Sequence, residues 1–263
     1  MSSKSFNLIL SNKISPFNKI IRVDSDKSIS IRSFLIASIS QNISIVNNIL
    51  ESMDVKSTIA ACRKLGVKIH KIKSKSYRVY GKGLGSLFAK KNLQLNFGNS
   101  GTLARLLIGL LSTTPDINIK IKGDHSLNKR SMKKLINIMS EFGALFLPKN
   151  KFNFPLKIIS SELPVGINYK AGISAQLKSA VLLAGLNSYG STKIEEQEKS
   201  RDHTENMLLN NSRVIKIKNN KKKLIIINGR KKLKPLNINV PGDPSSAAFF
   251  SALTLLQKKS TIT

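Results

Sequence analysis

The repeat that decides the fold is clearest in residues 131–159, SMKKLINIMSEFGALFLPKNKFNFPLKII. Apolar residues recur at helical spacing from Ser131 to Phe142, which predicts an amphipathic helix. Gly143-Ala144 then opens a strand, and a hairpin turns at residues 149–151 and returns to Ile159. The stretch therefore predicts a helix followed by a β-hairpin.

Two other stretches repeat this order. The earlier copy has a predicted helix over residues 55–65 and a hairpin over residues 71–80. The later copy starts at Arg201, has Ser212 in place of the glycine, and turns at residues 219–221 between two strand-like runs. The copies start about 70–77 residues apart, which suits a βαβαββ unit rather than a short solenoid repeat.

Each unit also contains an earlier helix that follows a polar turn. Residues 28–39, 101–111 and 174–186 begin with small or hydroxyl residues and then become strongly apolar. The first turn of a helix offers free N–H groups and a positive dipole end, so each start is a candidate anion site. A further apolar helix follows Ser246, and residues 258–263 read as a new strand, so we expect a fourth unit that breaks off.

The charge is strongly positive, because 44 Lys and Arg residues face 14 Asp and Glu residues, giving a formal +30. Binding of nucleic acid would need stacking aromatics, and the 6% aromatic content without Trp disfavours it. Most lysines are expected to be solvated, including the basic hairpin over residues 216–234. A site for a polyanionic small molecule remains open locally.

The cysteine count indicates a reducing compartment, because one cysteine, Cys62, cannot form an internal disulfide framework. We therefore expect a cytoplasmic protein. Cys62 and the three histidines are too scattered for an obvious zinc site. No apolar run approaches about 18 residues, so no membrane span is expected. The Ser-rich start, residues 1–19, resembles a transit peptide but has no long apolar core, so targeting is not expected.

The first helix start places Lys27 and Ser28 together. A phosphate or carboxylate site could form there, with Lys27 supplying charge and Ser28 a hydroxyl cap. Arg32 follows about one turn later on the same face and could bind a carboxylate through two N–H groups. The ordinary alternative for Ser28 is N-capping alone.

The other helix starts carry comparable groups. In the turn before the second helix, Gly101 has no Cβ and lets the backbone approach an anion closely. Arg130 precedes the amphipathic helix, and Ser174 and Gln176 would provide a cap and an exposed amide. Each of these residues also has a purely structural interpretation. Together with Lys27, they are what the binding of two phosphorylated acids requires.

These motifs resemble those of the 5-enolpyruvylshikimate-3-phosphate synthase family, also called 3-phosphoshikimate 1-carboxyvinyltransferases. They occur in family order and span nearly the whole chain. The matching runs are DKSIS (26–30), GNSGT (98–102), GD (123–124) with SL (126–127) and Arg130, SAQLKSAVLLAGLN (174–187), RDHTE (201–205) and VPGDPSSAAFF (240–250).

The resemblance implies an α/β (α+β) fold, the inside-out α/β barrel of the enolpyruvyl transferases. Family members have two similar domains of three βαβαββ units each, with helix N-termini pointing into the cleft between them. Residues 24–241 would form the three-unit N-terminal domain. Residues 1–23 would be the first strand of a second, mostly missing domain, and residues 242–263 would return into it as the start of a fourth unit.

The resemblance also implies a reaction and a site. The enolpyruvyl group of phosphoenolpyruvate would be transferred to the 5-hydroxyl of shikimate 3-phosphate, with release of phosphate, by a monomer that uses no cofactor and no metal. Lys27, the catalytic assignment, would contact both substrates. The shikimate 3-phosphate ligands would be Lys27, Ser28, Arg32, Ser174, Gln176, Ser200 and Arg201. The phosphoenolpyruvate ligands would be Lys27, Gly101, Arg130 and Gln176.

Some features depart from the family pattern. Ile31 stands where the family usually has His, and Ser131 where Pro follows the arginine. The family's catalytic Asp, a Lys and further Arg residues would come from beyond Thr263. We therefore expect this chain alone to bind shikimate 3-phosphate weakly and not to turn over.

Two rival interpretations remain. A sister enolpyruvyl transferase that acts on a UDP-amino sugar would carry a reactive cysteine on a mobile loop, which Cys62 in a predicted core helix does not match. An inactive basic fragment that binds nucleic acid would show tight and steeply salt-dependent binding.

Overall fold

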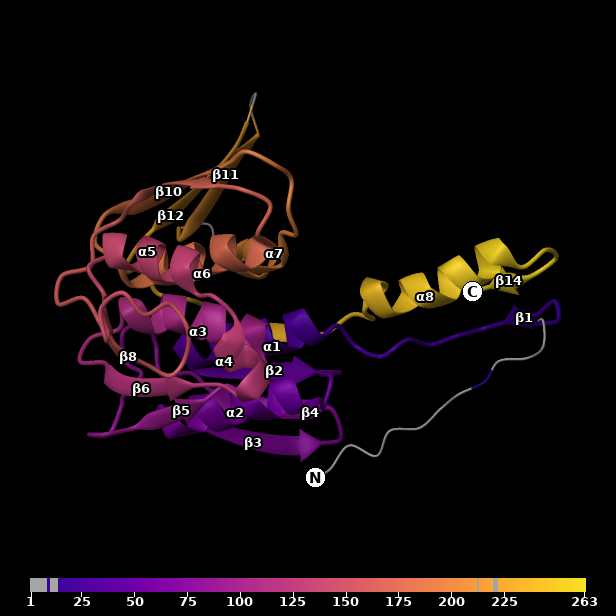
Figure 1. The fold of residues 1–263 in the computed structure, drawn as a ribbon, viewed down its shortest axis with the longest axis horizontal. Coiled ribbons are helices and arrows are strands. Elements are labelled where there is room, and N and C mark those ends of the chain that lie inside the picture. Colours follow the sequence, from indigo (N-terminus) through magenta and orange to yellow (C-terminus); the bar gives the residue numbers. More distant parts are fainter. Residues whose placement is uncertain (1–8, 10–13, 212, 220–221) are drawn as a thin grey trace. The chain divides into compact units, whose positions relative to one another are not determined.

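Figure 1 shows a computed structural model of the chain, which describes residues 9, 14–211, 213–219 and 222–263. The chain divides into two compact units. The larger unit is Ser25–Pro241, and the smaller combines Met1–Asp24 with Gly242–Thr263. Ser212 and residues 220–221 of the predicted third hairpin lie outside the described residues, as does most of the N-terminal segment through residue 13.

The larger unit repeats one sheet topology three times, which confirms the predicted βαβαββ units. The three four-stranded sheets have the orders β13-β2-β4-β3, β5-β6-β8-β7 and β9-β10-β12-β11. In each sheet the first two strands are parallel, and the last two form an antiparallel hairpin beside them.

The elements of each sheet, with the helices between its strands, follow in the order of the repeat. The first set is β13 (Asn237–Asn239), α1 (Lys27–Ile39), β2 (Ile43–Asn47), α2 (Met53–Lys64), β3 (Lys68–Lys73) and β4 (Ser76–Tyr80). The second is β5 (Gln94–Asn96), α3 (Gly101–Ser112), β6 (Asn118–Lys122), α4 (His125–Lys129), α5 (Lys133–Glu141), β7 (Leu145–Leu147) and β8 (Leu156–Ile159). The third is β9 (Asn168–Ala171), α6 (Ala175–Asn187), β10 (Ser191–Glu196), α7 (His203–Leu208), β11 (Ile215–Asn219) and β12 (Lys223–Asn228).

The first strand of the first sheet, β13, comes from the C-terminal end of the larger unit. β13 pairs in parallel with β2, so that Asn237 lies beside Ile45 and Asn239 beside Asn47. The Ile45 N–H donates to the Asn237 side chain at 3.0 Å, and the Asp26 N–H donates to the Pro241 carbonyl at 2.9 Å. The two ends of the larger unit therefore meet at the beginning of α1.

Three apolar helices form the centre of the larger unit. α1, α3 and α6 are buried along most of their length, and α3 packs against both of the others. The approach of α3 to α6 is close at Gly109, where an added Cβ would lie 2.5 Å from the Ala180 carbonyl oxygen. In the described part of the chain, no helix is both long enough and apolar enough to cross a membrane.

Two local predictions need correction. The helix expected from Ser131 begins at Lys133, and a separate short helix, α4, precedes it. Ser28 does not cap α1, because the Asp26 side chain accepts the Ile29 N–H at 2.7 Å. The prediction that Cys62 belongs to the core is confirmed, since it is 2% exposed.

Where the structure describes the smaller unit, at residues 9, 14–24 and 242–263, it contains one helix and a pair of short strands. α8 (Pro244–Leu256) starts after Asp243, whose side chain accepts the Ser245 N–H at 2.8 Å. β1 (Asn18–Lys19) pairs in parallel with β14 (Thr261–Ile262). The predicted apolar helix and the strand after it are therefore present.

The contact at Gly109 predicts that Gly109→Ala destabilises the larger unit. Alanine has a higher helix propensity than glycine, but the overpacking of its Cβ against backbone atoms destabilises the fold by more than this gain. We therefore expect the free energy of unfolding to fall by about 1–2 kcal/mol. Urea denaturation followed by circular dichroism measures it. Gly172→Ala is the control, because nothing lies within 4 Å of its added Cβ. Equal stability of the two variants would contradict the packing argument.

Candidate active site

The starts of the three central helices meet around one polar pocket of about 380 Å³. α1 contributes Lys27, α3 contributes Gly101, Thr102 and Arg105, and α6 contributes Gln176. Asp54, Asn99 and Arg130 complete the lining. The structure thus brings together four of the predicted site residues: Lys27, Gly101, Arg130 and Gln176.

The charge of this pocket is positive, because Lys27, Arg105 and Arg130 outnumber the single carboxylate, Asp54. The Lys27 ammonium lies 3.2 Å from the Asp54 carboxylate, and about half of the Lys27 side chain is exposed. Burial, and then the neighbouring charge of Arg130, lower the pKa of Arg105 below its usual value. Two guanidinium groups held this close favour an anion between them.

Gln176 joins α6 to α3 across the pocket. Its Oε1 accepts from Arg105 Nη1 at 2.9 Å, and its Nε2 donates to Thr102 Oγ1 at 3.0 Å. The same Arg105 Nη1 also donates to the Gly101 carbonyl at 3.1 Å. Arg105 was not among the residues predicted from the sequence to form the site. Its position one turn after Gly101, on the same helix face, is the signal that could have identified it.

Gly101 leaves the pocket open beside both arginines. A Cβ at this position would lie 2.8 Å from Arg105 Nη1 and 3.2 Å from Arg130 Nη1. Arg130 is held by Asn99, whose Oδ1 accepts from its Nη2 at 2.7 Å. The helix start at Ser100, whose side chain accepts the Leu103 N–H at 3.2 Å, fixes this turn.

Arg32 is predicted as a ligand but does not line this pocket. It is 4% exposed and donates to the Ser28 carbonyl, Ser179 Oγ and Thr204 Oγ1 at 3.1, 3.0 and 2.9 Å. Burial lowers the pKa of its guanidinium to about 10, against the opposing effects of Asp26 and Glu205. Ser174, another predicted ligand, caps α6 by accepting the Leu177 N–H at 3.4 Å.

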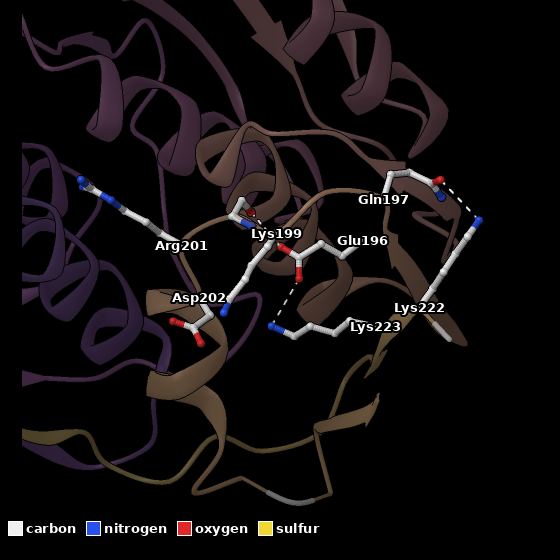
Figure 2. Close-up of a pocket in the computed structure, with 8 residues that line it drawn as sticks. Glu196, Gln197, Lys199, Arg201, Asp202, Lys222 and Lys223 are labelled. Carbon is white, nitrogen blue, oxygen red and sulfur yellow. Dashed lines mark hydrogen bonds and ion pairs between the residues drawn. The ribbon is translucent and has the colours of Figure 1, made fainter. Parts of the chain in front are cut away.

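Ser200 and Arg201 line a different pocket, of about 590 Å³, beside the hairpin of β11 and β12 (Figure 2). Lys199, Lys222 and Lys223 also line it. The Arg201 side chain points away from the two hairpin lysines in this view. The structure therefore does not bring these two predicted ligands into the pocket of Lys27.

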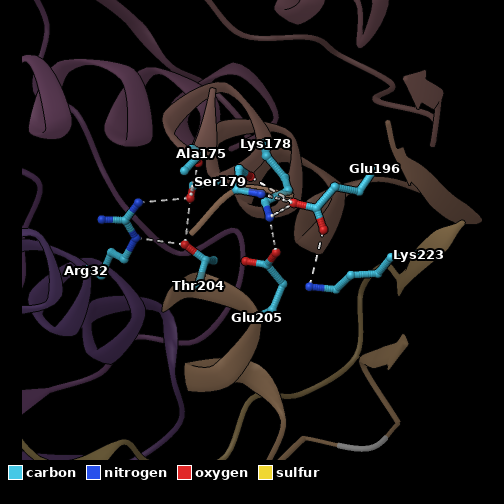
Figure 3. A network of polar contacts seen from close by, with 9 residues as sticks. Arg32, Ala175, Lys178, Ser179, Glu196, Thr204, Glu205 and Lys223 are labelled. Atoms are coloured by element: carbon cyan, nitrogen blue, oxygen red, sulfur yellow. Dashed lines mark hydrogen bonds and ion pairs between the residues drawn. The ribbon is translucent and has the colours of Figure 1, made fainter. Parts of the chain in front are cut away.

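A buried ion network lies behind this second pocket and was not predicted (Figure 3). Lys178 of α6 is fully buried, and its ammonium lies 2.6 Å from both the Glu196 and Glu205 carboxylates. Glu196 also accepts from the Ser200 N–H and hydroxyl, at 3.0 and 2.9 Å. Burial alone would raise the pKa of Glu196, but the hydrogen bonds from Lys178 and Ser200 outweigh it and lower the pKa to about 2.

The lowered pKa of Glu196 predicts a pH dependence of stability. Because the folded pKa lies below the ordinary 4.5, the ionised carboxylate stabilises the fold above pH 4.5, and this contribution is lost as the pH falls towards 2. Glu196→Gln should be less stable than wild type at pH 6, by about 1.5–3 kcal/mol, with the gap closing on acidification. Urea titrations from pH 6 to 2 measure it. The control is exposed Glu162→Gln, and a gap that stays constant for Glu196→Gln would contradict this reasoning.

Comparison with known proteins identifies relatives of nearly the whole chain. The family model described as EPSP synthase (3-phosphoshikimate 1-carboxyvinyltransferase) matches residues 11–263. A 3-phosphoshikimate 1-carboxyvinyltransferase of Acidiphilium cryptum is 38% identical over 250 residues, which cover 94% of this chain and 56% of that protein. The enzyme of the same name from Novosphingobium aromaticivorans is 40% identical, with the same coverage.

The solved structures agree with the sequence relatives. An EPSP synthase structure from Acinetobacter baumannii superposes with a TM-score of 0.81 at 36% sequence identity, covering 94% of this chain and 55% of that one. The chain spans about half the length of the curated relatives that it matches. The repeated sheets, the convergent helix starts and these matches lead to one conclusion: the chain belongs to the EPSP synthase family.

Proposed function

We propose that the chain serves in the transfer of the enolpyruvyl group of phosphoenolpyruvate to the 5-hydroxyl of shikimate 3-phosphate, with release of phosphate. The proposal rests on one observation, the pocket at which the starts of α1, α3 and α6 converge. The positive side chains of Lys27, Arg105 and Arg130 line this pocket. The name shared by the relatives favours this reaction over that of a transferase acting on a UDP-amino sugar.

The chemistry requires two anions to be held side by side. The substrate hydroxyl loses its proton as its oxygen adds to C2 of phosphoenolpyruvate, and C3 of phosphoenolpyruvate gains a proton. The C2–O bond to phosphate then breaks as that C3 loses a proton, which restores the double bond and releases phosphate. Gly101 and Arg130 would hold phosphoenolpyruvate, and Lys27 and Gln176 would lie between the two substrates. Arg105, which bonds to Gln176, would add positive charge on the same side.

Shikimate 3-phosphate would extend from Lys27 towards the start of α1 and α6. Ser28, Arg32 and Ser174 would bind it, with Ser200 and Arg201 near its phosphate. These roles rest on the family motifs rather than on the pocket. Arg32 retains N–H groups for a ligand, because its three bonds to the chain use three of the five N–H donors of a guanidinium.

We also propose that the smaller unit is part of a second domain. α8 supports this, because none of its residues is buried, and Phe249, Leu255 and Leu256 are 79%, 88% and 85% exposed. Exposed apolar side chains in such number are typical of a surface that another segment covers. The greater length of the relatives supports further units of the same kind.

Lys27→Ala tests the proposed substrate site. Loss of a charged contact should weaken the binding of shikimate 3-phosphate about tenfold or more, measured by isothermal titration calorimetry. Lys90→Ala is the matched control, since Lys90 is exposed and lines neither pocket described above. Equal affinity of both variants would contradict the site. In a phosphate-release assay with both substrates, we expect no steady turnover from the chain alone.

Gly101→Ala tests the phosphoenolpyruvate side of the pocket. Its Cβ would displace the arginine ends described above, so binding of phosphoenolpyruvate or of a phosphonate analogue should weaken about tenfold, while shikimate 3-phosphate binds as before. Calorimetry in the presence of shikimate 3-phosphate measures this, with Gly172→Ala as the control. Unchanged affinity for both anions would place phosphoenolpyruvate elsewhere.

A further inference from the structure

The ion pair of Lys178 with Glu205 lies next to the two hydroxyl residues that hold Arg32. Lys178 and Ser179 are consecutive on α6, and they face Thr204 and Glu205, which are consecutive on α7 (Figure 3). Lys178 pairs with Glu205 at 2.6 Å, and Thr204 Oγ1 donates to Ser179 Oγ at 2.8 Å. Two adjacent bridges therefore join the same short stretches of the two helices.

The second of these bridges holds the Arg32 side chain. Arg32 Nε donates to Thr204 Oγ1 at 2.9 Å, and Nη2 donates to Ser179 Oγ at 3.0 Å. Both acceptors are hydroxyl groups, whose positions depend on how α7 sits against α6. A small shift of α7 would move Thr204 away from Ser179 and release the guanidinium from one side.

α7 depends on tertiary contacts for its position. It has six residues, and so short a helix is not stable on its own. Glu205 is fully buried and forms an ion pair with the Lys178 ammonium, and its charge also acts on Arg32. Among the described residues, no hydrogen-bond donor supplements this ion pair at either Glu205 oxygen. The Lys178 charge therefore holds α7 against α6 together with the buried side chains of Met207 and Leu208.

We infer that Lys178 and Glu205 are positioning residues, whose buried ion pair places α7 so that Thr204 and Ser179 orient Arg32 for shikimate 3-phosphate. The pair touches no substrate, and in this inference its effect on shikimate 3-phosphate passes through Arg32. This inference rests on the proposed function for its substrate. The orientation of Arg32 can be measured without any substrate.

The alternative is that the pair merely stabilises the fold. Apolar residues of similar volume often replace a buried ion pair without loss of stability, whereas removal of one partner leaves an uncompensated charge. The double variant Lys178→Met/Glu205→Met therefore separates the two roles. This variant removes both charges and keeps the volume of the two side chains. Packing between α6 and α7 is therefore preserved while their electrostatic attraction is lost.

The test measures hydrogen exchange at Arg32 Nε–H by ¹⁵N NMR, with the signal assigned by its loss in Arg32→Lys. In the double variant we expect a folded chain whose urea midpoint is no lower than that of Glu196→Gln, which loses the same Lys178–Glu196 hydrogen bond. We also expect Nε–H exchange at least about tenfold faster, and affinity for shikimate 3-phosphate about tenfold lower. Lys223→Met is the control, because it removes the other lysine at Glu196, 3.3 Å away, and leaves Glu205 untouched. It should match wild type in the rate of Nε–H exchange.

Exchange as slow as in wild type, in a folded double variant, would overturn the inference. Faster exchange with unchanged affinity would overturn the link to substrate. If wild type itself does not bind shikimate 3-phosphate, the proposed function fails, and the exchange rates alone decide the positioning role. If the double variant does not fold, Glu205→Gln is judged by the same criteria, because Lys178 there keeps Glu196 as its counter-ion.

Discussion

The close contact of α3 with α6 at Gly109 and Ala180 is the constraint on which the site depends. Because no side chain separates the helices there, their axes approach closely, and Gln176 at the start of α6 reaches Thr102 and Arg105 at the start of α3. α1 packs against α3 and brings Lys27 to the same place. A buried glycine thereby determines where three positive helix ends meet.

The sequence predicted what local pattern encodes. The three central helices, the hairpins and the burial of Cys62 follow from apolar spacing and turn residues, and the structure confirms them. The features that the sequence did not predict depend on contacts between residues that are distant in the chain. β13 is an Asn-Ile-Asn run with no strand signal of its own, and it becomes a strand only by pairing with β2, 192 residues away in sequence.

The sequence predicted the site residues at helix starts and turns but missed those inside helices. Lys27, Gly101, Arg130 and Gln176 stand at helix starts or turns, where backbone geometry makes a polar side chain informative. Arg105 and Lys178 lie inside helices, where lysine and arginine are usually solvated, so their roles needed the packed structure. Ser28 and Asp26 are both good capping residues two positions apart, and only the observed bond to Ile29 decides between them.

The borrowed strand β13 has a consequence for how this fold can be rearranged. Because Asp26 and Pro241 are hydrogen-bonded, the N-terminal and C-terminal ends of the larger unit lie side by side. A unit with neighbouring ends is a self-contained insertion, which can be excised, grafted into a host loop or given new termini at a hairpin turn without breaking a sheet. The three-fold repeat then has no obligatory first member, because the strand that completes the first sheet already comes from the other end of the unit.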